Sequence, residues 1–379
     1  MKKKVLVCFG TRPELIKLLS LILFLKDKKN INLILCNTSQ HTNLIKPIID
    51  FYQIKIHYDL KILKHNQSLS TLTSRLIKKM ENLFYEISPS SIVVQGDTTT
   101  ALVSSLVGFY FKINVFHIEA GLRTNDIYSP WPEEINRQII SKIAKHNYTP
   151  TLLAKKNLIK ENINNKLITV CGNTVIDALL ITLDKIFKDT LIEKELDKKF
   201  RFIDNNKFIV LLTVHRRENH GIPIKEIFMA INKIANEKNI QIIYSIHVNP
   251  NVLSAANKYL SNSKNITRIE SVNYVDFVYL MSKSNLIITD SGGIQEEAPT
   301  IGKPCLVTRD KTERPETIIS GSGILVGHDK DKIYKNFVKI RNNEKIYKKM
   351  SKKRNLYGNG KAFKIIGESI SKIMSLDEK

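Results

Sequence analysis

Near its N-terminus the chain reads Val5-Leu6-Val7-Cys8-Phe9-Gly10-Thr11-Arg12-Pro13-Glu14, and the pattern of this segment recurs along the sequence. The uninterrupted apolar run Val5–Phe9 is typical of a parallel strand covered on both faces. Gly10 and Thr11 suit a turn, and proline is favoured at the first position of a helix. The segment therefore predicts a strand followed at once by a helix, which we expect to run from about Glu14 to Lys26.

Short apolar runs of the same kind follow at intervals, separated for the most part by segments with a helical pattern. We expect strands at Ile31–Cys36, Ser91–Val94, Asn114–Ile118, Ile168–Cys171, Phe208–Thr213, Gln241–Ile246, Ile266–Glu270, Leu286–Thr289 and Pro304–Val307. Residues 332–374 read as helical, with a break near 357–360. Such alternation predicts parallel sheets with right-handed crossovers, here in two α/β, doubly wound, Rossmann-like domains.

The domain boundary is expected near Gly172-Asn173. The first domain would span residues 1–172, completed by the C-terminal helix 361–379, and the second residues 173–360. Ligands of such folds bind at the carboxyl ends of the strands. We therefore expect the active site in the cleft between the two domains.

Composition limits the function classes. The 379 residues are 42 % hydrophobic and carry a net charge of +23, which raises the question of nucleic-acid binding. The lysines are scattered, however, and no aromatic residues interleave with them to stack bases. We interpret the charge as solvated helix faces that would attract an anionic substrate, and we expect neither nucleic acid nor membrane as a partner.

The cysteines and the N-terminus carry no sign of export or of a metal site. Cys8, Cys36, Cys171 and Cys305 lie in or beside apolar runs and form no CxxC pair, so we expect buried thiols and no metal. The apolar run after Lys2–Lys4 ends at Gly10, too early for a signal peptide. No apolar stretch approaches the ~20 residues needed to span a bilayer, so we expect a cytoplasmic protein.

Polar residues gather at strand ends of the first domain. Asp97 follows one strand directly and could cap the next helix; Glu119 follows another strand directly. Glu133 and Arg137 are four residues apart and could pair on one helix face. Together with Arg12, these residues bring carboxylates and cations to one sheet edge.

The second domain offers features suited to an anion. His215-Arg216-Arg217 follows the strand Phe208–Thr213, and three basic residues at a strand end suggest phosphate binding. The segment Asp290–Glu297 follows another strand and opens a helix, whose glycines and free amides can approach an anion closely. Neither a P-loop nor a GxGxxG fingerprint is present. Asp329 reads as a helix cap.

Taken in order, these motifs resemble the signature blocks of the non-hydrolysing UDP-N-acetylglucosamine 2-epimerases. The blocks are Gly10–Glu14, Gly96–Thr99, His117–Arg123, Trp131–Glu134, His215–Asn219 and Asp290–Pro299. The resemblance implies a GT-B-like fold, a homodimer and no added cofactor. It also implies that the product supplies surface polysaccharide synthesis.

The resemblance also implies residue roles. Arg12, His215, Ser291, Gly292 and Gly293 would hold the diphosphate; Phe277 would stack on uracil and Glu297 would bind the ribose; Lys17, Asp97, Glu119, Glu133, Arg137 and Arg314 would surround the sugar and the departing phosphate. In many relatives a second UDP-N-acetylglucosamine acts as an activator. The positions matching that site are Gln40, Asn43, Asn66, Glu134, Arg216 and His247, of which Asn43 and Asn66 depart from the family pattern.

The expected reaction interconverts UDP-N-acetylglucosamine and UDP-N-acetylmannosamine by elimination and re-addition of UDP through 2-acetamidoglucal. Asp97 and Glu133 are the expected proton handlers, with Glu119 in support. Three alternatives stay open: a hydrolysing 2-epimerase that releases N-acetylmannosamine, a 2-epimerase of a related UDP-linked deoxy or uronic sugar, and a glycosyltransferase of the same fold.

Overall fold

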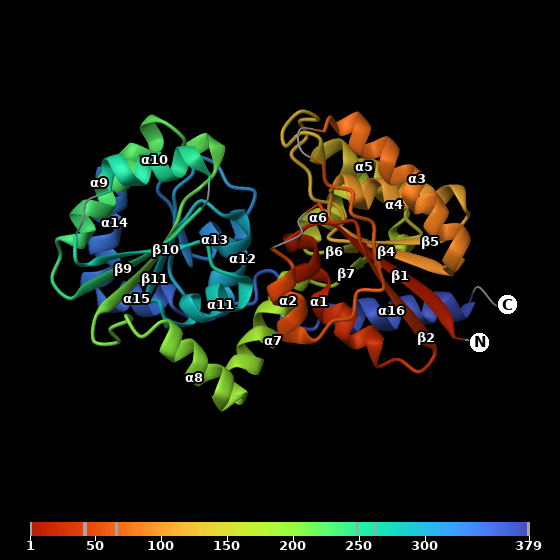
Figure 1. The fold of residues 1–379 in the computed structure, drawn as a ribbon. Coiled ribbons are helices and arrows are strands. Elements are labelled where there is room, and N and C mark those ends of the chain that lie inside the picture. Colours follow the sequence, from red (N-terminus) through yellow and green to blue (C-terminus); the bar gives the residue numbers. More distant parts are fainter. Residues whose placement is uncertain (1, 41–43, 65–66, 248, 261–262, 377–379) are drawn as a thin grey trace. The chain divides into compact units, whose positions relative to one another are not determined.

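The computed structural model describes residues 2–40, 44–64, 67–247, 249–260 and 263–376. The chain divides into two compact units (Figure 1), residues 1–180 with 357–379 and residues 181–356. The division falls between Leu180 and Ile181, inside helix α7 (Thr174–Lys188), and not at the end of the strand before it.

The described part of the first unit contains a seven-stranded sheet in the order β3-β2-β1-β4-β5-β6-β7, parallel throughout. Its strands are β1 (Lys3–Phe9), β2 (Ile31–Asn37), β3 (Tyr58–Asp59), β4 (Ser91–Gln95), β5 (Asn114–Ile118), β6 (His146–Thr149) and β7 (Ile168–Val170). The helices are α1 (Arg12–Lys26), α2 (Lys46–Tyr52), α3 (Leu69–Ile87), α4 (Thr99–Tyr110), α5 (Glu133–Ile143), α6 (Leu152–Lys160), η1 (Asn165–Leu167) and α16 (Ala362–Leu376), with α7 leading out of the unit.

The second unit is built on a six-stranded parallel sheet, counted over its described residues, in the order β10-β9-β8-β11-β12-β13. Its strands are β8 (Phe208–Thr213), β9 (Ile240–Ile246), β10 (Ile266–Glu270), β11 (Leu286–Thr289), β12 (Cys305–Val307) and β13 (Gly323–Leu325). The helices are α8 (Thr190–Lys199), η2 (Arg217–Asn219), α9 (Ile222–Ala235), α10 (Pro250–Tyr259), α11 (Tyr274–Lys283), α12 (Gly292–Thr300), α13 (Pro315–Ile319), α14 (Lys330–Asn342) and α15 (Glu344–Met350).

The two sheets share one topology, which fixes where a ligand can bind. Each begins at a central strand, runs outward in one direction and then reverses, so that the switch points lie between β1 and β4 and between β8 and β11. Crevices at the carboxyl ends of the strands beside such a switch are the usual ligand sites of doubly wound sheets. The expected fold class of two doubly wound Rossmann-like sheets is thus confirmed.

Most strands lie within one or two residues of their predicted bounds, and β5, β8, β10 and β11 match them. Three strands were not expected. β3 and β13 are very short, and β6 carries His146 and Asn147, which are buried polar residues. Their side chains conceal the apolar signal on which strand prediction depends.

The cores explain why the strands are uniformly apolar. Val5–Phe9 is wholly buried: Leu6 and Cys8 join a cluster with α3 and α4, and alternate residues face the other side of the sheet. On the first unit α16 packs against α1, where the ring of Phe363 meets that of Phe24 edge-on at 5.5 Å. The C-terminal helix therefore belongs to the first unit.

Two further expectations can be compared with the structure. All four cysteines are buried free thiols, as predicted. Asp329 caps α14 by accepting the backbone N–H of Lys332 at 2.7 Å, again as predicted. Within the described residues, no helix combines the length and the apolar character needed to cross a membrane.

Candidate active site

The turn between β1 and α1 is held by one buried carboxylate. Oε2 of Glu14 accepts the N–H groups of Gly10 (3.1 Å) and Thr11 (2.8 Å) and the Thr11 hydroxyl (2.7 Å). Its Oε1 accepts the hydroxyl of Thr98 at 2.6 Å, which belongs to the turn after β4. Burial raises the pKa of Glu14, and the hydrogen bonds oppose that shift. The two turns beside the β1–β4 switch are therefore fastened to each other.

Arg12 opens α1 at this point and is partly buried, which lowers the pKa of its guanidinium. Because the ordinary pKa of arginine lies far above neutrality, the side chain stays cationic near pH 7. Its positive charge can attract an anion to this turn.

Asp97 does not cap α4. Thr98 is the N-cap and accepts the Ala101 N–H at 3.1 Å, which leaves the Asp97 carboxylate to pair with Arg137. Asn136 reinforces this contact by donating its amide to the Asp97 carbonyl at 2.8 Å. Residues of α5 thus fix the strand-end carboxylate from the side.

The Glu133–Arg137 pair that the four-residue spacing allows is not formed. Arg137 instead contacts Asp97 and, at 3.3 Å, Glu134, which is fully buried and also accepts the N–H of Thr124 at 3.1 Å. Glu133 is the first residue of α5 and partly exposed, and its carboxylate has no hydrogen-bond or ion-pair partner in the described part of the chain.

Glu119 follows β5 in an unusual conformation. Its φ of +62° lies in the left-handed region, where a non-glycine residue costs about 1–2 kcal/mol. The Glu119 carboxylate accepts hydrogen bonds from Nζ of Lys17, at 2.5 and 2.7 Å to its two oxygens, and from the Gln95 amide at 2.5 Å. Only 5 % of the Glu119 side chain is exposed. Strain of this kind is typical of functional positions. Two elements, α1 and β4, therefore converge on Glu119.

The corresponding edge of the second unit centres on Asp290, directly after β11. Oδ2 of this fully buried residue accepts the N–H groups of His215 (2.9 Å) and Arg216 (2.8 Å) and the amide of Asn219 (2.9 Å). The basic segment after β8 is thereby tied to the segment after β11, across the β8–β11 switch.

The N-terminus of α12 is bordered by two guanidinium groups. A methyl group added at Gly292 would lie 3.5 Å from Nη2 of Arg216 and 3.6 Å from Cζ of Arg314. Arg314 is itself oriented by Glu296, whose Oε1 accepts its Nε–H at 2.6 Å. Ser291 is the N-cap and makes no side-chain capping bond within the described residues. Free amides, a hydroxyl and two cations make this a strong anion site.

The remaining nucleotide candidates lie on α11 and α12. Glu297 is buried and accepts the hydroxyl of Tyr274 at 3.3 Å, and Phe277 lies one turn after Tyr274 on α11. A carboxylate beside an aromatic helix face can bind a diol and a base.

Four of the six residues expected to hold an activator are described by the structure. Gln40 lies against Gly10, where a methyl group would approach its Cγ to 3.3 Å. The ring of His247 stacks on that of His215 at 5.0 Å and an angle of 15°. Glu134 is enclosed in the first unit, Arg216 borders α12, and Asn43 and Asn66 lie outside the described residues.

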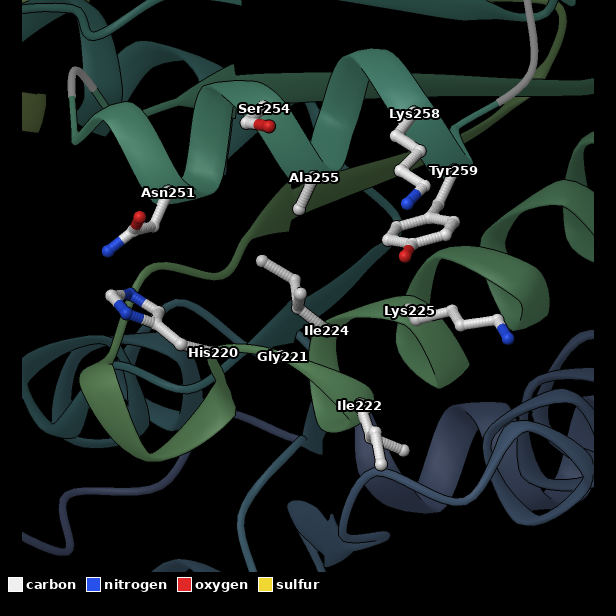
Figure 2. A pocket seen from close by; sticks show the side chains of 10 residues that line it. All are labelled: His220, Gly221, Ile222, Ile224, Lys225, Asn251, Ser254, Ala255, Lys258 and Tyr259. Carbon is white, nitrogen blue, oxygen red and sulfur yellow. The ribbon is translucent and has the colours of Figure 1, made fainter.

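A hollow of about 630 Å³ lies elsewhere in the second unit, between α9 and α10 (Figure 2). Ile224 and Ala255 face each other at its centre, with Asn251 and His220 at one end. The complete lining is His220, Gly221, Ile222, Ile224, Lys225, Asn251, Ser254, Ala255, Lys258 and Tyr259. It contains none of the residues predicted for the substrate. In the described part of the chain no group of His, Cys, Asp and Glu has the arrangement of a metal site.

A family model described as UDP-N-acetylglucosamine 2-epimerase matches residues 24–371. The chain belongs to this family. It is 45 % identical to the UDP-N-acetylglucosamine 2-epimerase of Neisseria meningitidis serogroup A, covering 97 % of this chain and 99 % of the relative.

Solved structures agree with the assignment to the epimerase family. The Neisseria meningitidis UDP-GlcNAc 2-epimerase bound to UDP-GlcNAc superposes with a TM-score of 0.91 at 44 % identity, covering 97 % of this chain and 100 % of that one. The S. aureus MnaA–UDP structure gives 0.87 at 36 % identity, with coverages of 99 % and 97 %. The family resemblance and the GT-B-like class expected from the sequence are thus confirmed.

In this epimerase-family chain, sequence reasoning assigned no role to several residues that build the site. Gln95 and Glu296 orient Glu119 and Arg314. His117 is buried, and Nε2 of its ring lies 2.8 Å from the carbonyl of Gly96; burial lowers its pKa to about 4, so the ring is neutral. Gln95 adjoins a signature block, and His117 and Glu296 lie within two others, but no local pattern indicates their roles, because their partners are distant in the chain.

Proposed function

We propose that the protein interconverts UDP-N-acetylglucosamine and UDP-N-acetylmannosamine without releasing the sugar. The C1–O bond to UDP breaks first, and loss of the C2 proton then gives 2-acetamidoglucal, with the electron pair of the C2–H bond forming the C1=C2 double bond. UDP adds back to C1 while a proton arrives on the opposite face of C2. The product is an activated amino sugar for surface polysaccharide synthesis.

One observation carries the proposal. Three carboxylates, Asp97, Glu119 and Glu133, follow β4 and β5 or open α5, at the edge of a sheet where ligands bind. A reaction that moves a proton between two faces of one carbon needs two proton-handling groups, and closely placed carboxylates can be tuned to opposite roles.

The contacts of these carboxylates support a division of roles. Both oxygens of Glu119 are engaged by Lys17 and Gln95, which suits a supporting role. Glu133 has no such partner in the described residues, and Asp97 is partly exposed beside Arg137. We propose Asp97 and Glu133 as the proton handlers.

The second unit would hold UDP. Departure of UDP builds negative charge on its phosphate oxygens, and preorganised donors at such a position are worth about 3–4 kcal/mol each. The α12 N-terminus with Ser291, Gly292 and Gly293 would supply these donors, together with His215, Arg314 and, from the first unit, Arg12. Phe277 and Glu297 would bind uracil and ribose.

The test is an NMR time course of the purified protein with UDP-N-acetylglucosamine in deuterated water. We expect UDP-N-acetylmannosamine carrying deuterium at C2, and deuterium entering the starting material. Free N-acetylmannosamine with stoichiometric UDP would instead make the protein a hydrolysing enzyme. Unchanged UDP-N-acetylglucosamine would contradict the proposal, and the assay would then be repeated with UDP-linked deoxy and uronic amino sugars and with acceptor sugars for a transferase.

We further propose a homodimer and activation by UDP-N-acetylglucosamine. The stacking of His247 on His215 supports a link between the activator positions and the substrate positions. Sigmoidal dependence of the reverse reaction on added UDP-N-acetylglucosamine, with loss of this behaviour in His247→Ala, would support activation. Hyperbolic kinetics in the wild type would contradict it. Light scattering tests the homodimer, since the mass in solution should be that of two chains; the mass of one chain would contradict it.

A further inference from the structure

Asp290 has two carboxylate oxygens in different surroundings. Oδ2 accepts three hydrogen bonds, from the N–H groups of His215 and Arg216 and from Asn219. Oδ1 is equally buried and has no hydrogen-bond partner among the described residues. A buried oxygen without a donor costs about 1–3 kcal/mol, so such a group calls for an explanation.

The ring of His215 lies close to this oxygen. Its Nδ1 lies 3.8 Å from Oδ1, and 35 % of the His215 side chain is exposed. The gap exceeds a hydrogen bond. Contacts of this kind often tighten only when the substrate is bound. One face of the His215 ring is stacked on the ring of His247, with 5.0 Å between the ring centroids.

We propose that Asp290 is a positioning residue that acts through His215. Its Oδ1 accepts the Nδ1–H of the imidazole; when the diphosphate binds, Nε2 takes up a proton from solvent and donates this N–H to a phosphate oxygen. The same residue also holds the backbone of His215 through Oδ2, so one side chain fixes both the place and the orientation of the ring. This inference rests on the proposed UDP-binding role of the second unit.

A purely structural role predicts something different. If Asp290 served only to hold the segment after β8, its Oδ2 contacts would account for its whole effect. Asp290→Asn separates the two roles: the amide oxygen can keep accepting the bonds made to Oδ2, while an NH₂ group replaces Oδ1 and can no longer accept from Nδ1. Asn219→Ala is the matched control, because it removes one bond to Oδ2, together with the bond from Asn219 to the Thr308 carbonyl, and leaves Oδ1 unchanged.

The first experiment observes the ring itself in the free protein. The side-chain ¹⁵N signals of His215, assigned by their loss in His215→Asn, should show a protonated Nδ1 in the wild type and in Asn219→Ala. In Asp290→Asn the proton should move to Nε2. An unprotonated Nδ1 in the wild type, or unchanged signals in Asp290→Asn, would overturn the inference whether or not UDP binds.

The second experiment measures UDP affinity by calorimetry in a double-mutant cycle. Loss of a hydrogen bond to a charged group should weaken UDP binding about tenfold in Asp290→Asn. In the His215→Asn background the same change should cost less than about twofold, because residues that act as a unit are not additive. Equal losses in both backgrounds would show that Asp290 acts only on the fold.

The outcomes also separate this inference from the proposed function. If the wild type binds no UDP, the proposed function and the orientation of Nε2 toward the diphosphate both fail. The ¹⁵N signals of His215 would then still decide whether Asp290 holds the ring. Thermal unfolding of each variant shows whether a change in affinity reflects a change in stability.

Discussion

The hydroxyl of Thr98 donates to Oε1 of Glu14 over 2.6 Å and so links two turns that are 84 residues apart in sequence. One turn carries Arg12 and the other carries Asp97. Asp290 performs the same task in the second unit, where its carboxylate accepts two consecutive backbone N–H groups of the turn after β8. In both units a buried carboxylate at the switch point holds a turn that carries predicted site residues.

Thr98→Val should separate the two turns of the first unit. The variant loses both the bond to Glu14 and the cap of α4, so we expect the free energy of unfolding to fall by about 1–3 kcal/mol. The epimerisation rate should fall as well, because Asp97 and Arg12 lose their fixed separation. Thr98→Ser keeps the hydroxyl and is the control. Urea unfolding and NMR rates that are equal in the two variants would contradict the role of this bond.

Lys17→Met should leave the Glu119 carboxylate buried without its cation. Breaking a buried ion pair from one side costs about 3 kcal/mol or more, and turnover should be lost as well. Lys17→Met with Glu119→Gln removes both charges, so we expect stability to return without activity. If the double variant is no more stable than Lys17→Met, the Lys17–Glu119 contact does not contribute as the structure indicates.

Asp97→Asn should abolish proton transfer while leaving UDP in place. We expect turnover to fall by about 10²–10⁴, the usual contribution of a general acid or base. UDP affinity should stay within about threefold of the wild type, because the proposed diphosphate ligands other than Arg12 lie in the second unit. Calorimetry with UDP checks this directly. Loss of UDP binding together with turnover would mean that Asp97 is structural.

We expect Asp177 to make the stability of the protein fall as pH rises. Burial raises its pKa to about 6, although Oδ1 accepts the N–H of Phe363 at 3.0 Å at the start of α16. Between about pH 4 and pH 6 the native state therefore binds more protons than the unfolded chain. The contribution of this residue to the free energy of unfolding then falls by about 2–3 kcal/mol as pH rises through that window.

Asp177→Asn isolates this effect, since the amide keeps the acceptor for Phe363 and cannot ionise. The variant should equal the wild type near pH 4 and be more stable at pH 7. Denaturant unfolding of both proteins across pH 4–7 measures the difference, which cancels the contribution of other groups. A constant difference over that range would show that Asp177 does not titrate in the native state.

The sequence by itself determined the fold class and the motifs. Buried parallel strands are continuous apolar runs, so β5, β8, β10 and β11 could be delimited from local composition. The glycines and charged residues at strand ends could also be recognised in the sequence, because the chain turns there and ligands of such folds bind there. β6 was not predicted because its buried His146 and Asn147 are polar, and the hydrogen bonds that they make to Thr169 and Ser141 exist only in the folded chain.

Tertiary structure alone decided which charged groups meet. Lys17 reaches Glu119 across 102 residues, and Arg137 turns away from Glu133 to Asp97, 40 residues earlier. No local pattern encodes such pairs, because strand order and not sequence distance brings the ends of β4 and β5 next to α1 and α5. The free energy of a buried charge depends on the groups packed around it, and these are set only when the sheet has formed.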